Sequence, residues 1–453
     1  MKRSTAAIIG GGLCGNLLAI CLARRGFSVE VYERRSHAQF MTPAGGRSIN
    51  LALAARGISA LQRFDAFAGI ESLLLPMRGR MLHEADAAPV SAPYGASGEC
   101  IFSVSRAALN LALHDIASQQ YGVKFTFEAH CTRMHAQTLD PVFSHAGSEF
   151  AAEADVFFAA DGAGSTVRRA LAQANRLTSA ESLLDHAYKE LSIAPDPGTG
   201  THRLHGESLH IWPRGEFMLI ALPNTDGSFT ATLFLPQHGE PSFESLSADG
   251  VANFFATQFP DAVELIPDLT EQFARNEVGV LGTVRCKPWH AGRCLLIGDA
   301  AHAIVPFHGQ GMNAAFEDVA ELDVLLARDG TPDWPTLFAE FEQRRTSNTD
   351  AIAEMALENY QEMRSDVRDP DFALRRTVAL ELERRHPGKF ASRYSMVMFR
   401  PDVPYSQARS IAVAQDAMLR KLTRDVSSVA EVDFRRAAQL VAELPQPDQP
   451  SEH

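Results

Sequence analysis

The fold of this chain is decided by residues Gly298–Asn313, which read GDAAHAIVPFHGQGMN. The apolar run Cys294–Ile297 precedes this stretch and indicates a buried strand, and the helix-forming run Ala314–Ala327 follows it. A strand therefore delivers Asp299, then a glycine-rich turn, then the first turn of a helix. Such a helix end has unpaired N–H groups and a partial positive charge, so it is suited to bind an anion or the polar edge of a ring.

The chain opens with a second turn of this kind, GGGLCG, directly after the strand-like run Thr5–Ile9. Gly10, Gly12 and Gly15 have the spacing that gives a tight turn, a close backbone approach to a pyrophosphate and close helix packing. The next predicted strand ends in Glu33, where a carboxylate can accept a hydrogen bond from a ribose hydroxyl. A glycine-rich turn that serves packing alone is the alternative explanation.

The acid at this position favours a nucleotide whose adenosine ribose carries free hydroxyls, as in FAD or NAD. Arg34 and Arg35 follow it directly and are suited to bind a phosphate on the ribose, which is the alternative nucleotide, so Arg34 is a candidate cofactor contact. Two nucleotide-handling turns near opposite ends of the chain predict one large cofactor that both ends bind.

Size and composition are those of a soluble globular protein with two or three domains. The chain has 453 residues, of which 45% are apolar and 21% charged. Its formal net charge of −13 argues against nucleic acid or an anionic membrane as the main partner. Anionic ligands must then be attracted locally, by helix ends and single arginines.

The cysteines and the N-terminus bear on the cellular compartment. Six cysteines form neither a C-x-x-C pair nor a metal-ligand spacing, which predicts free thiols in a reducing cytoplasm and no metal site. Lys2 and Arg3 precede an apolar run, as in a signal peptide, but the glycine turn interrupts that run. No stretch of about 20 uninterrupted apolar residues occurs, so no membrane span is expected.

The pattern changes in the middle of the chain. Ser208–Pro213, Glu216–Pro223 and Ser228–Leu235 alternate as strands do, and they predict a mixed sheet. Asn50–Leu75 is predicted to be helical, and Pro76–Ser97 is predicted to be a polar, proline-bearing excursion.

A third signature, DGAGS, begins at Asp161 after a further buried strand. The three signatures in this order resemble the FAD-dependent aromatic hydroxylases of the para-hydroxybenzoate hydroxylase type. The resemblance implies that FAD is the cofactor and that NADPH is a transient co-substrate without a domain of its own. The cofactor contacts it implies are Gly10, Gly12, Gly15 and Glu33 at the adenylate half, Arg106 near the phosphates, Asp299 at the ribityl or pyrophosphate region, Gly309, Gly311, Met312 and Asn313 facing the isoalloxazine, and Asp161 on the side of the nicotinamide-dependent step.

The fold class that follows is α/β, with a Rossmann-like FAD-binding domain, an inserted mixed β-sheet substrate domain and a C-terminal helical region. The expected boundaries are 1–75, 98–179 and 291–334 for the FAD-binding domain, 76–97 and 180–290 for the substrate domain, 335–445 for the helical region, and 446–453 for a disordered tail.

Longer sequence segments narrow the resemblance to the kynurenine 3-monooxygenases. They are GRSINLAL at 46–53, MRGRM at 77–81, PYG at 93–95, YKEL at 188–191, LHIWPRG at 209–215, PFHGQGMN at 306–313, ALENY at 356–360 and RYSMV at 393–397. The resemblance runs from about residue 5 to residue 410. It implies hydroxylation of L-kynurenine ortho to the ring amine, with FAD, NADPH and O₂, through a flavin C4a-hydroperoxide as oxidant.

The same resemblance implies a substrate pocket. A zwitterionic amino acid needs a forked cation and hydroxyl donors for its carboxylate, and arginine supplies that geometry. The carboxylate contacts implied are Arg80, Tyr94, Asn359 and Tyr394. The walls around the aryl ring implied are Phe234, Phe307, Leu209, Met218, Leu222 and Met363, with His308 and Glu362 near the polar end as the candidate catalytic groups. A solvated Arg80, and plain core packing for the apolar residues, are the alternatives.

Other functions stay open at this point. Eukaryotic relatives end in a hydrophobic anchor, whereas charged residues run throughout Ile411–His453, so a soluble, cytoplasmic, bacterial-type form is expected. The runner-up is a same-fold FAD monooxygenase for another aromatic acid, and the rival class is a non-catalytic flavoprotein. A flavin-dependent halogenase is discounted, because Trp212, Trp289 and Trp334 do not form its Trp-x-Trp segment. A homodimer is one assembly open to the chain.

Overall fold

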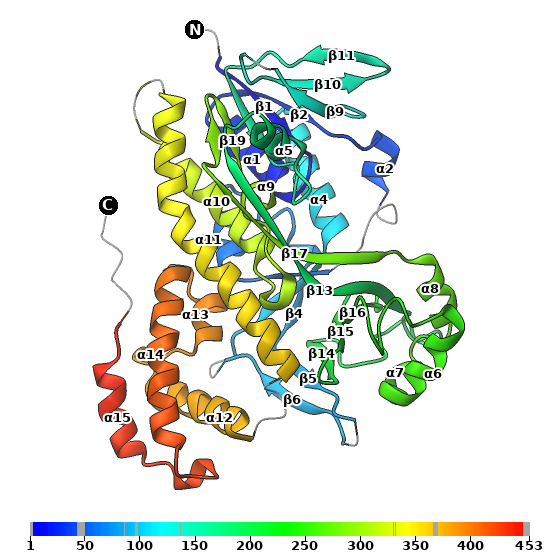
Figure 1. The fold of residues 1–453 in the computed structure, drawn as a ribbon, viewed down its shortest axis with the longest axis vertical. Helices are drawn as coiled ribbons and strands as arrows, with labels where there is room; N and C mark the ends of the chain where they lie inside the picture. The colour runs from blue at the N-terminus through cyan, green and yellow to red at the C-terminus, as the bar shows by residue number, and fades with distance from the viewer. Residues whose placement is uncertain are drawn as a thin grey trace. The chain divides into compact units, whose positions relative to one another are not determined.

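The computed structural model describes residues 3–42, 50–85, 87–95, 98–135, 137–328, 330, 332–365 and 370–446. The chain forms two units that alternate along the sequence (Figure 1). The first unit comprises Met1–Leu74, Val104–Leu183 and Gly282–Ala353, and the second comprises Leu75–Ser103, Leu184–Leu281 and Glu354–His453.

A six-stranded sheet forms the centre of the first unit. Its strands, in spatial order, are β18 His290–Ala291, β19 Cys294–Leu296, β12 Val156–Ala159, β1 Thr5–Ile9, β2 Ser28–Tyr32 and β8 Lys124–Thr126. All neighbours pair in parallel except β18 and β19. The strands are short, nearly continuous apolar runs, as expected where helices cover both faces of a parallel sheet. Strands from the start of the chain and from residues 290–296 therefore share one sheet.

Helices of the first unit begin where the glycine turns end. They are α1 Leu13–Arg24, α2 His37–Met41, α3 Ala55–Arg63, α4 Arg106–Asp115, α5 Thr166–Gln173, α9 Asp299–His302, α10 Gly311–Leu326 and the first part of α11 Trp334–Ser365. Helix α1 starts directly after the first glycine turn. A small antiparallel sheet of β9 His130–Met134, β10 Pro141–His145 and β11 Ser148–Ala151 completes this unit.

One prediction in this unit is wrong in part. Asn50–Leu53 is the strand β3 rather than the start of a helix, and α3 follows only from Ala55. The Asn313 side chain explains the extended backbone, since it donates to the Ala52 carbonyl and accepts from the Ala54 N–H, both at 2.9 Å. An amide that bridges two alternate backbone groups fixes a strand-like conformation, which no local periodicity signals.

A seven-stranded mixed sheet dominates the second unit. Its order is β17 Val278–Lys287, β13 Thr178–Ile193, β16 Phe229–Pro236, β15 Met218–Pro223, β14 Ser208–Pro213, β5 Gly79–Leu82 and β6 Val90–Pro93. Strands β5 and β14 pair in parallel, while β13, β16, β15 and β14 pair antiparallel in turn. The predicted mixed sheet is confirmed. The prediction of an excursion over Pro76–Ser97 is wrong, because this segment holds β4 Leu75–Met77, β5 and β6.

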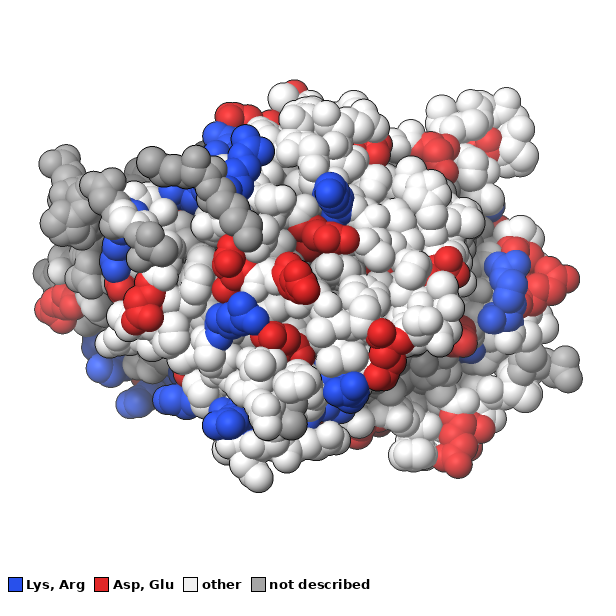
Figure 2. Space-filling view, turned by 90° about the horizontal axis from the view of Figure 1, so that it is seen from above, with Lys and Arg blue, Asp and Glu red and all other residues white. Residues whose placement is uncertain are grey.

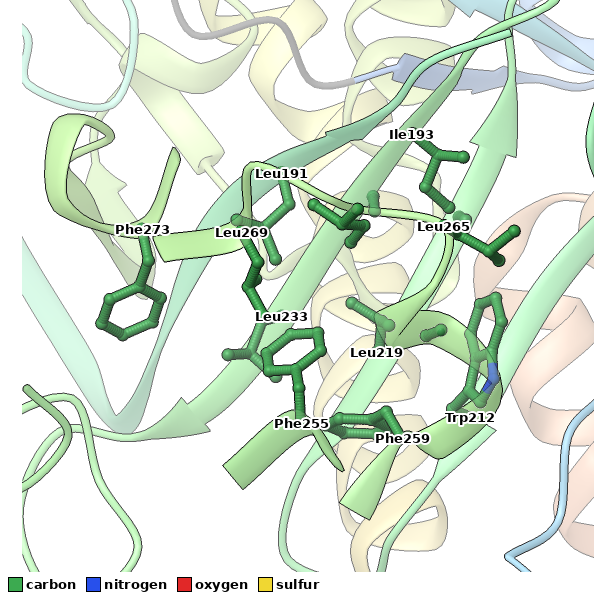
Figure 3. Close-up of a cluster of buried hydrophobic side chains, with 14 of the residues drawn as sticks. Leu191, Ile193, Trp212, Leu219, Leu233, Phe255, Phe259, Leu265, Leu269 and Phe273 are labelled. Atoms are coloured by element: carbon green, nitrogen blue, oxygen red, sulfur yellow. The ribbon is translucent and has the colours of Figure 1, made fainter. Parts of the chain in front are cut away.

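One face of this sheet is covered by α6 Ala248–Gln258, α7 Pro260–Val263 and α8 Leu269–Arg275. Trp212, Leu219, Leu233, Phe255 and Phe259 pack between the strands and these helices (Figure 3). Side chains of a strand alternate between the two faces. Residues one position away along the same strands, such as Met218 and Phe234, therefore lie on the opposite face.

The C-terminal helical region is confirmed. It contains α12 Pro370–Arg385, α13 Arg393–Phe399, α14 Tyr405–Thr423 and α15 Phe434–Glu443, which share a core around Val378, Leu382 and Met418. Residues 447–453 of the predicted disordered tail lie outside the described residues. None of the helices that the described residues form has the length and apolar character needed to cross a lipid bilayer.

Candidate active site

The two glycine turns lie at the same edge of the first sheet. Strands β1 and β19 both pair in parallel with β12, so their carboxyl ends point the same way. A Cβ built on Gly298 would lie 3.0 Å from the Sγ of Cys14, which places the second turn against the start of α1. Ligands of open α/β sheets bind at this edge. The structure thus brings together turns that are far apart in the sequence.

The three glycines of the first turn have different environments. Gly10 has φ +104°, and a Cβ there would lie 2.6 Å from the Ala160 carbonyl oxygen. A Cβ on Gly15 would lie 2.0 Å from the Gly10 carbonyl oxygen, so the helix can approach the strand only without a side chain. A Cβ on Gly12 would meet no described atom within 4 Å. Gly10 and Gly15 therefore allow close packing, while Gly12 faces open space.

Helices α1 and α10, which both begin at this edge, lack a side-chain cap. The N-cap residues are Gly12 for α1 and Gln310 for α10, and neither makes a side-chain capping hydrogen bond. By contrast, Ser105 and Ser165 cap α4 and α5 with their hydroxyl groups. The first N–H groups of α1 and α10 are therefore left for another acceptor. Gly12 and these helix starts fit a pyrophosphate and a flavin edge.

Glu33 is held ready as an ionised acceptor at the end of β2. It is 4% exposed, and its carboxylate accepts from the Gly11 N–H and from the Arg35 side chain, each at 2.9 Å. Burial acts to raise the pKa of Glu33, but the hydrogen bonds and charge of Arg35 and the Gly11 N–H outweigh it and lower the pKa. A carboxylate has about four acceptor positions, and the Gly11 N–H, the Arg35 N–H and two Arg35 guanidinium nitrogens already donate to them, so a ribose hydroxyl would replace one of the Arg35 donors. Arg34, beside it, is exposed.

Asp299 is the first residue of α9 and is half-buried at this edge. Its surroundings depend on Asp318, a residue of α10 that sequence reasoning missed. The Asp318 carboxylate accepts from the Gly298 N–H at 3.1 Å and binds His302 Nε2 at 2.5 Å and Arg345 Nε at 2.7 Å. Asp318 therefore fixes both ends of the Gly298–His302 segment.

The electrostatics of this carboxylate are those of a buried ion pair. Burial alone would raise the pKa of Asp318, but the charges of His302 and Arg345 and their hydrogen bonds lower it below its ordinary value. The neighbouring Glu317 binds Arg345 and Arg56, each at 2.7 Å. The signal in the sequence was the adjacent pair of acids, Glu317 and Asp318, inside a helix whose buried side is mostly apolar.

The remaining predicted residues of the second turn are buried or half-buried. Asn313 is fully buried, and its side chain binds backbone groups of Ala52, Ala54 and Gly309. Its backbone N–H at the start of α10, rather than its amide, is therefore the group that can face a ligand. His308 is buried in a short 3₁₀ turn, and Phe307, Gly309, Gly311 and Met312 are half-buried.

Two further predicted cofactor residues lie on neighbouring helices. Arg106 is exposed and opens α4, one turn before Asn110, whose amide donates to the Gly11 carbonyl at 3.2 Å. Residues four apart share a helix face, so Arg106 is on the side of α4 that meets the first turn. Asp161 accepts from the Thr166 N–H at 2.8 Å, and so supports the start of α5. Burial raises the pKa of Asp161 despite these hydrogen bonds.

A second candidate site lies in the second unit, around Arg80 on β5. Tyr94, just after β6, and Tyr394 on α13 stack with ring centroids 5.3 Å apart. The Arg80 guanidinium carbon lies 5.5 Å from the Tyr94 ring and 4.6 Å from the Tyr394 ring. Within the described part of the chain, Arg80 Nε and the Tyr94 hydroxyl are buried and have no hydrogen-bond partner. Burial, with Tyr394 next, raises the pKa of Tyr94 well above its ordinary value.

Apolar side chains continue the same sheet face as Arg80. Arg80 is beside Leu209 in the β5–β14 register, and Met218 is beside Phe234 in the β15–β16 register. Met218, Leu222 and Phe234 are each less than a tenth exposed, and all lie opposite the Trp212 core. A forked cation, two phenols and an apolar wall thus share one unit, which suits an aromatic amino acid.

Helix α11 supplies the remaining predicted residues. Asn359 is half-buried, and Tyr360 beside it binds Asp185 at 2.9 Å and His186 Nδ1 at 2.6 Å. The Glu362 carboxylate accepts from Arg393 at 2.6 Å, so it is an ion-pair partner within the helical region. The side chain of Met363 and residues 46–49 of the GRSINLAL word lie outside the described residues.

A cavity of about 540 Å³ in the first unit lies at the opposite edge of the sheet from the glycine turns. It is lined by Ser4, which precedes β1, and by Arg24, Arg63 and Asp323 near the C-terminal ends of α1, α3 and α10. Helix C-termini carry partial negative charge, and the arginines there balance it.

On the face that Figure 2 shows, acidic and basic side chains are intermixed rather than gathered in a basic patch.

Comparisons with known proteins agree with this geometry. A family model described as an FAD binding domain matches residues 3–355. A protein of Myxococcus xanthus named kynurenine 3-monooxygenase is 43% identical over 97% of this chain and 95% of its own length. One of the same name from Xanthomonas euvesicatoria pv. vesicatoria is 45% identical over 94% of each chain. The solved structure of a tetrameric 2-methyl-3-hydroxypyridine-5-carboxylic acid oxygenase matches 83% of this chain and 96% of its own, with a TM-score of 0.67 at 18% identity.

Proposed function

This chain belongs to the kynurenine 3-monooxygenase family of FAD-binding proteins, and we propose that it hydroxylates L-kynurenine to 3-hydroxykynurenine with NADPH and O₂. Reduced by NADPH, bound FAD supplies an oxygen atom from O₂ to the aromatic ring. The residues of the chain then have three tasks, which are to hold the cofactor, orient the substrate and keep water out.

The residues at the sheet edge fit FAD. Open space at Gly12 and the uncapped starts of α1 and α10 give the pyrophosphate and the flavin edge unshared N–H donors. Glu33, ionised and buried, takes an adenosine ribose hydroxyl, and Asp299 takes the ribityl side. Gly309, Gly311, Met312 and Asn313 face the isoalloxazine through their backbone, and Arg106 and Asp161 flank the phosphates and the nicotinamide-dependent step.

A single observation carries the substrate assignment, namely the cluster of Arg80, Tyr94 and Tyr394 on an otherwise apolar sheet face. Buried donors without a partner are costly, and a substrate carboxylate removes that cost at Arg80 Nε and the Tyr94 hydroxyl. Asn359 and Tyr394 complete the carboxylate contacts. Phe234, Met218, Phe307 and Met363 wall the aryl ring.

Proton transfer by protein groups has a small part in this proposal. Glu362 is paired with Arg393, so it is not a free general base, and His308 is buried beside the second turn. We assign them to shaping the polar end of the pocket. The domain assignment is part of the same proposal, with the first unit binding FAD and the second binding the amino acid.

The function is tested by NADPH oxidation with and without L-kynurenine, followed by identification of the product. We expect oxidation to be fast only with kynurenine, and to yield 3-hydroxykynurenine. Fast oxidation without a hydroxylated product would make kynurenine an effector, and would favour a same-fold monooxygenase for another aromatic acid. A yellow protein in which none of the tested aromatic acids supports NADPH oxidation would contradict monooxygenation altogether.

Assembly and location complete the proposal. A homodimer is proposed as the assembled state, and light scattering of the eluting protein tests it against the tetramer known for the structural relative. A cytoplasmic location is proposed because all six cysteines are unpaired thiols. Recovery of the protein in a periplasmic or membrane fraction would contradict it.

A further inference from the structure

Three aromatic side chains and a carboxylate form a chain of hydrogen bonds in the second unit, which runs from Trp212 through Asp261 and His83 to His210. His83 follows β5 directly and is 3% exposed. Its Nδ1 lies 2.8 Å from Asp261 Oδ2, and its Nε2 lies 2.9 Å from Nδ1 of His210 on β14. Nε2 of His210 lies 3.0 Å from the His205 carbonyl oxygen, and Trp212 Nε1 donates to Asp261 Oδ2 at 2.8 Å.

The protons of this chain can be assigned from one end to the other. A carbonyl oxygen only accepts, so His210 carries its proton on Nε2. Burial lowers the pKa of His210 to about 4, so at neutral pH its Nδ1 carries no proton and must accept from His83. His83 therefore has a proton on Nε2.

The other side of His83 needs a second proton. Burial would raise the pKa of Asp261, but its hydrogen bonds from His83 and Trp212 lower the pKa, so this carboxyl is ionised and can only accept. The contact to Asp261 then requires a proton on His83 Nδ1 as well. An imidazole with both nitrogens protonated is a cation.

The packing around His83 suits a cation. Its ring stacks on the Trp212 indole with centroids 4.1 Å apart and planes 20° apart, and an indole face attracts positive charge. Figure 3 shows that indole among the buried apolar side chains of the sheet core. Asp261 is the anion that faces His83, and Arg214, which donates to the His83 carbonyl at 2.8 Å, is the opposing cation. His210 is the neutral group beside it.

The position of His83 connects this cation to the proposed substrate site. Arg80 and His83 lie three residues apart at β5, so their side chains point to opposite faces of the sheet. The His83 N–H donates to the Ile211 carbonyl at 2.9 Å, which closes the β5–β14 register that places Arg80 beside Leu209. Among the described strands, β5 lies between β14 and the edge strand β6.

We propose that His83 is a buried imidazolium and the positioning residue that holds strand β5, and with it Arg80, in register against β14. The assignment of Arg80 to the substrate carboxylate rests on the proposed function, whereas the charge on His83 does not.

The charge is tested by ¹⁵N NMR of the histidine rings in the FAD-loaded protein at neutral pH. The chain has 16 histidines, and His83→Gln identifies the signal by its loss. We expect both ring nitrogens of His83 to be protonated in the native protein. In Asp261→Asn the side-chain amide can donate to Nδ1, so we expect a neutral His83 there. A neutral His83 in the native protein would overturn the proposal.

The positioning role is tested by steady-state kinetics with L-kynurenine. His83→Gln and Asp261→Asn should each raise KM about 3- to 10-fold while kcat changes less than about 2-fold, the size of effect usual for residues that act through a structural link. His238→Gln is the matched control, since His238 also pairs with a carboxylate, Glu244 at 2.8 Å, but on the surface.

The outcomes separate the two claims. An unchanged KM in both variants, or an equal rise in His238→Gln, would overturn the positioning role even if the NMR signature is present. Native protein that neither binds nor oxidises kynurenine would overturn the proposed function and the positioning role together. The NMR experiment would still decide the charge on His83, because it needs no substrate.

Discussion

At the scale of single residues, alanine substitutions at Gly12 and Gly15 should affect different properties, although the two glycines lie in the same turn. Gly15→Ala forces a Cβ to within 2.0 Å of the Gly10 carbonyl oxygen, and the overpacking should lower the free energy of unfolding by about 1–3 kcal/mol. Gly12→Ala meets no described atom within 4 Å, so the fold should be kept. Its methyl group would occupy the space proposed for the pyrophosphate, so FAD affinity should fall.

Chemical denaturation of the apoproteins and FAD titration measure the two effects separately. A Gly12→Ala protein that binds FAD as tightly as the native protein would contradict the proposed position of the pyrophosphate at Gly12. Equal destabilisation by both substitutions would contradict the packing difference.

A second prediction at this scale concerns the effect of substituting Arg80 on kynurenine binding. Arg80→Ala should weaken kynurenine binding by about 2–5 kcal/mol, because it leaves the substrate carboxylate buried without its cation. Arg80→Lys should restore little of this, since an ammonium cannot form the forked contact. Isothermal titration with kynurenine measures the affinity, and FAD content is the control because Arg80 is in the second unit. Native affinity in either variant would contradict the carboxylate role.

At the scale of elements, Asp318 joins α9, α10 and α11 through Gly298, His302 and Arg345. Its lowered pKa means that the ionised form stabilises the fold. This contribution is complete above the ordinary pKa of aspartate, about 3.9, and is lost as pH falls through the lower pKa of the folded state. Asp318→Asn should cost about 3–5 kcal/mol, because it leaves Arg345 short of a buried partner.

Thermal unfolding over a range of acidic pH measures this effect. The Asp318→Asn protein should unfold at a lower temperature near neutral pH, and the difference from the native protein should shrink as the pH falls. Asp416→Asn is a matched control, since Asp416 pairs with Arg420 on the exposed side of α14. A constant difference at every pH would contradict the ionised role of Asp318.

The elements also show what the sequence could predict and what it could not. Strands β1 and β14 were predicted with the bounds they have, because continuous or alternating apolar runs between turn residues are local signals. Strands β3 and β5 were missed. The first depends on the distant side chain of Asn313, and the second carries Arg80, whose polarity hides the strand pattern. The network of Asp318 and the His83 chain are likewise set by contacts between distant segments.

At the scale of the whole molecule, two units are built from alternating stretches of one chain. The first unit gathers both ends of its sequence at one sheet edge, and this organises the FAD site. The second gathers Arg80 and Tyr94 from the stretch Leu75–Ser103 and Tyr394 from the stretch Glu354–His453. Family motifs named these residues in advance, whereas the physical patterns of the sequence predicted only the turns and the sheets around them.

The central claim is that turns from both ends of the chain bind the same FAD molecule, and FAD titration tests it most directly. Native protein should bind one FAD, and Gly12→Asp and Asp299→Ala should each weaken that binding, since one places a carboxylate at the proposed pyrophosphate and the other removes the proposed ribityl contact. Undiminished FAD affinity in Asp299→Ala, or native protein that takes up no FAD, would contradict the account.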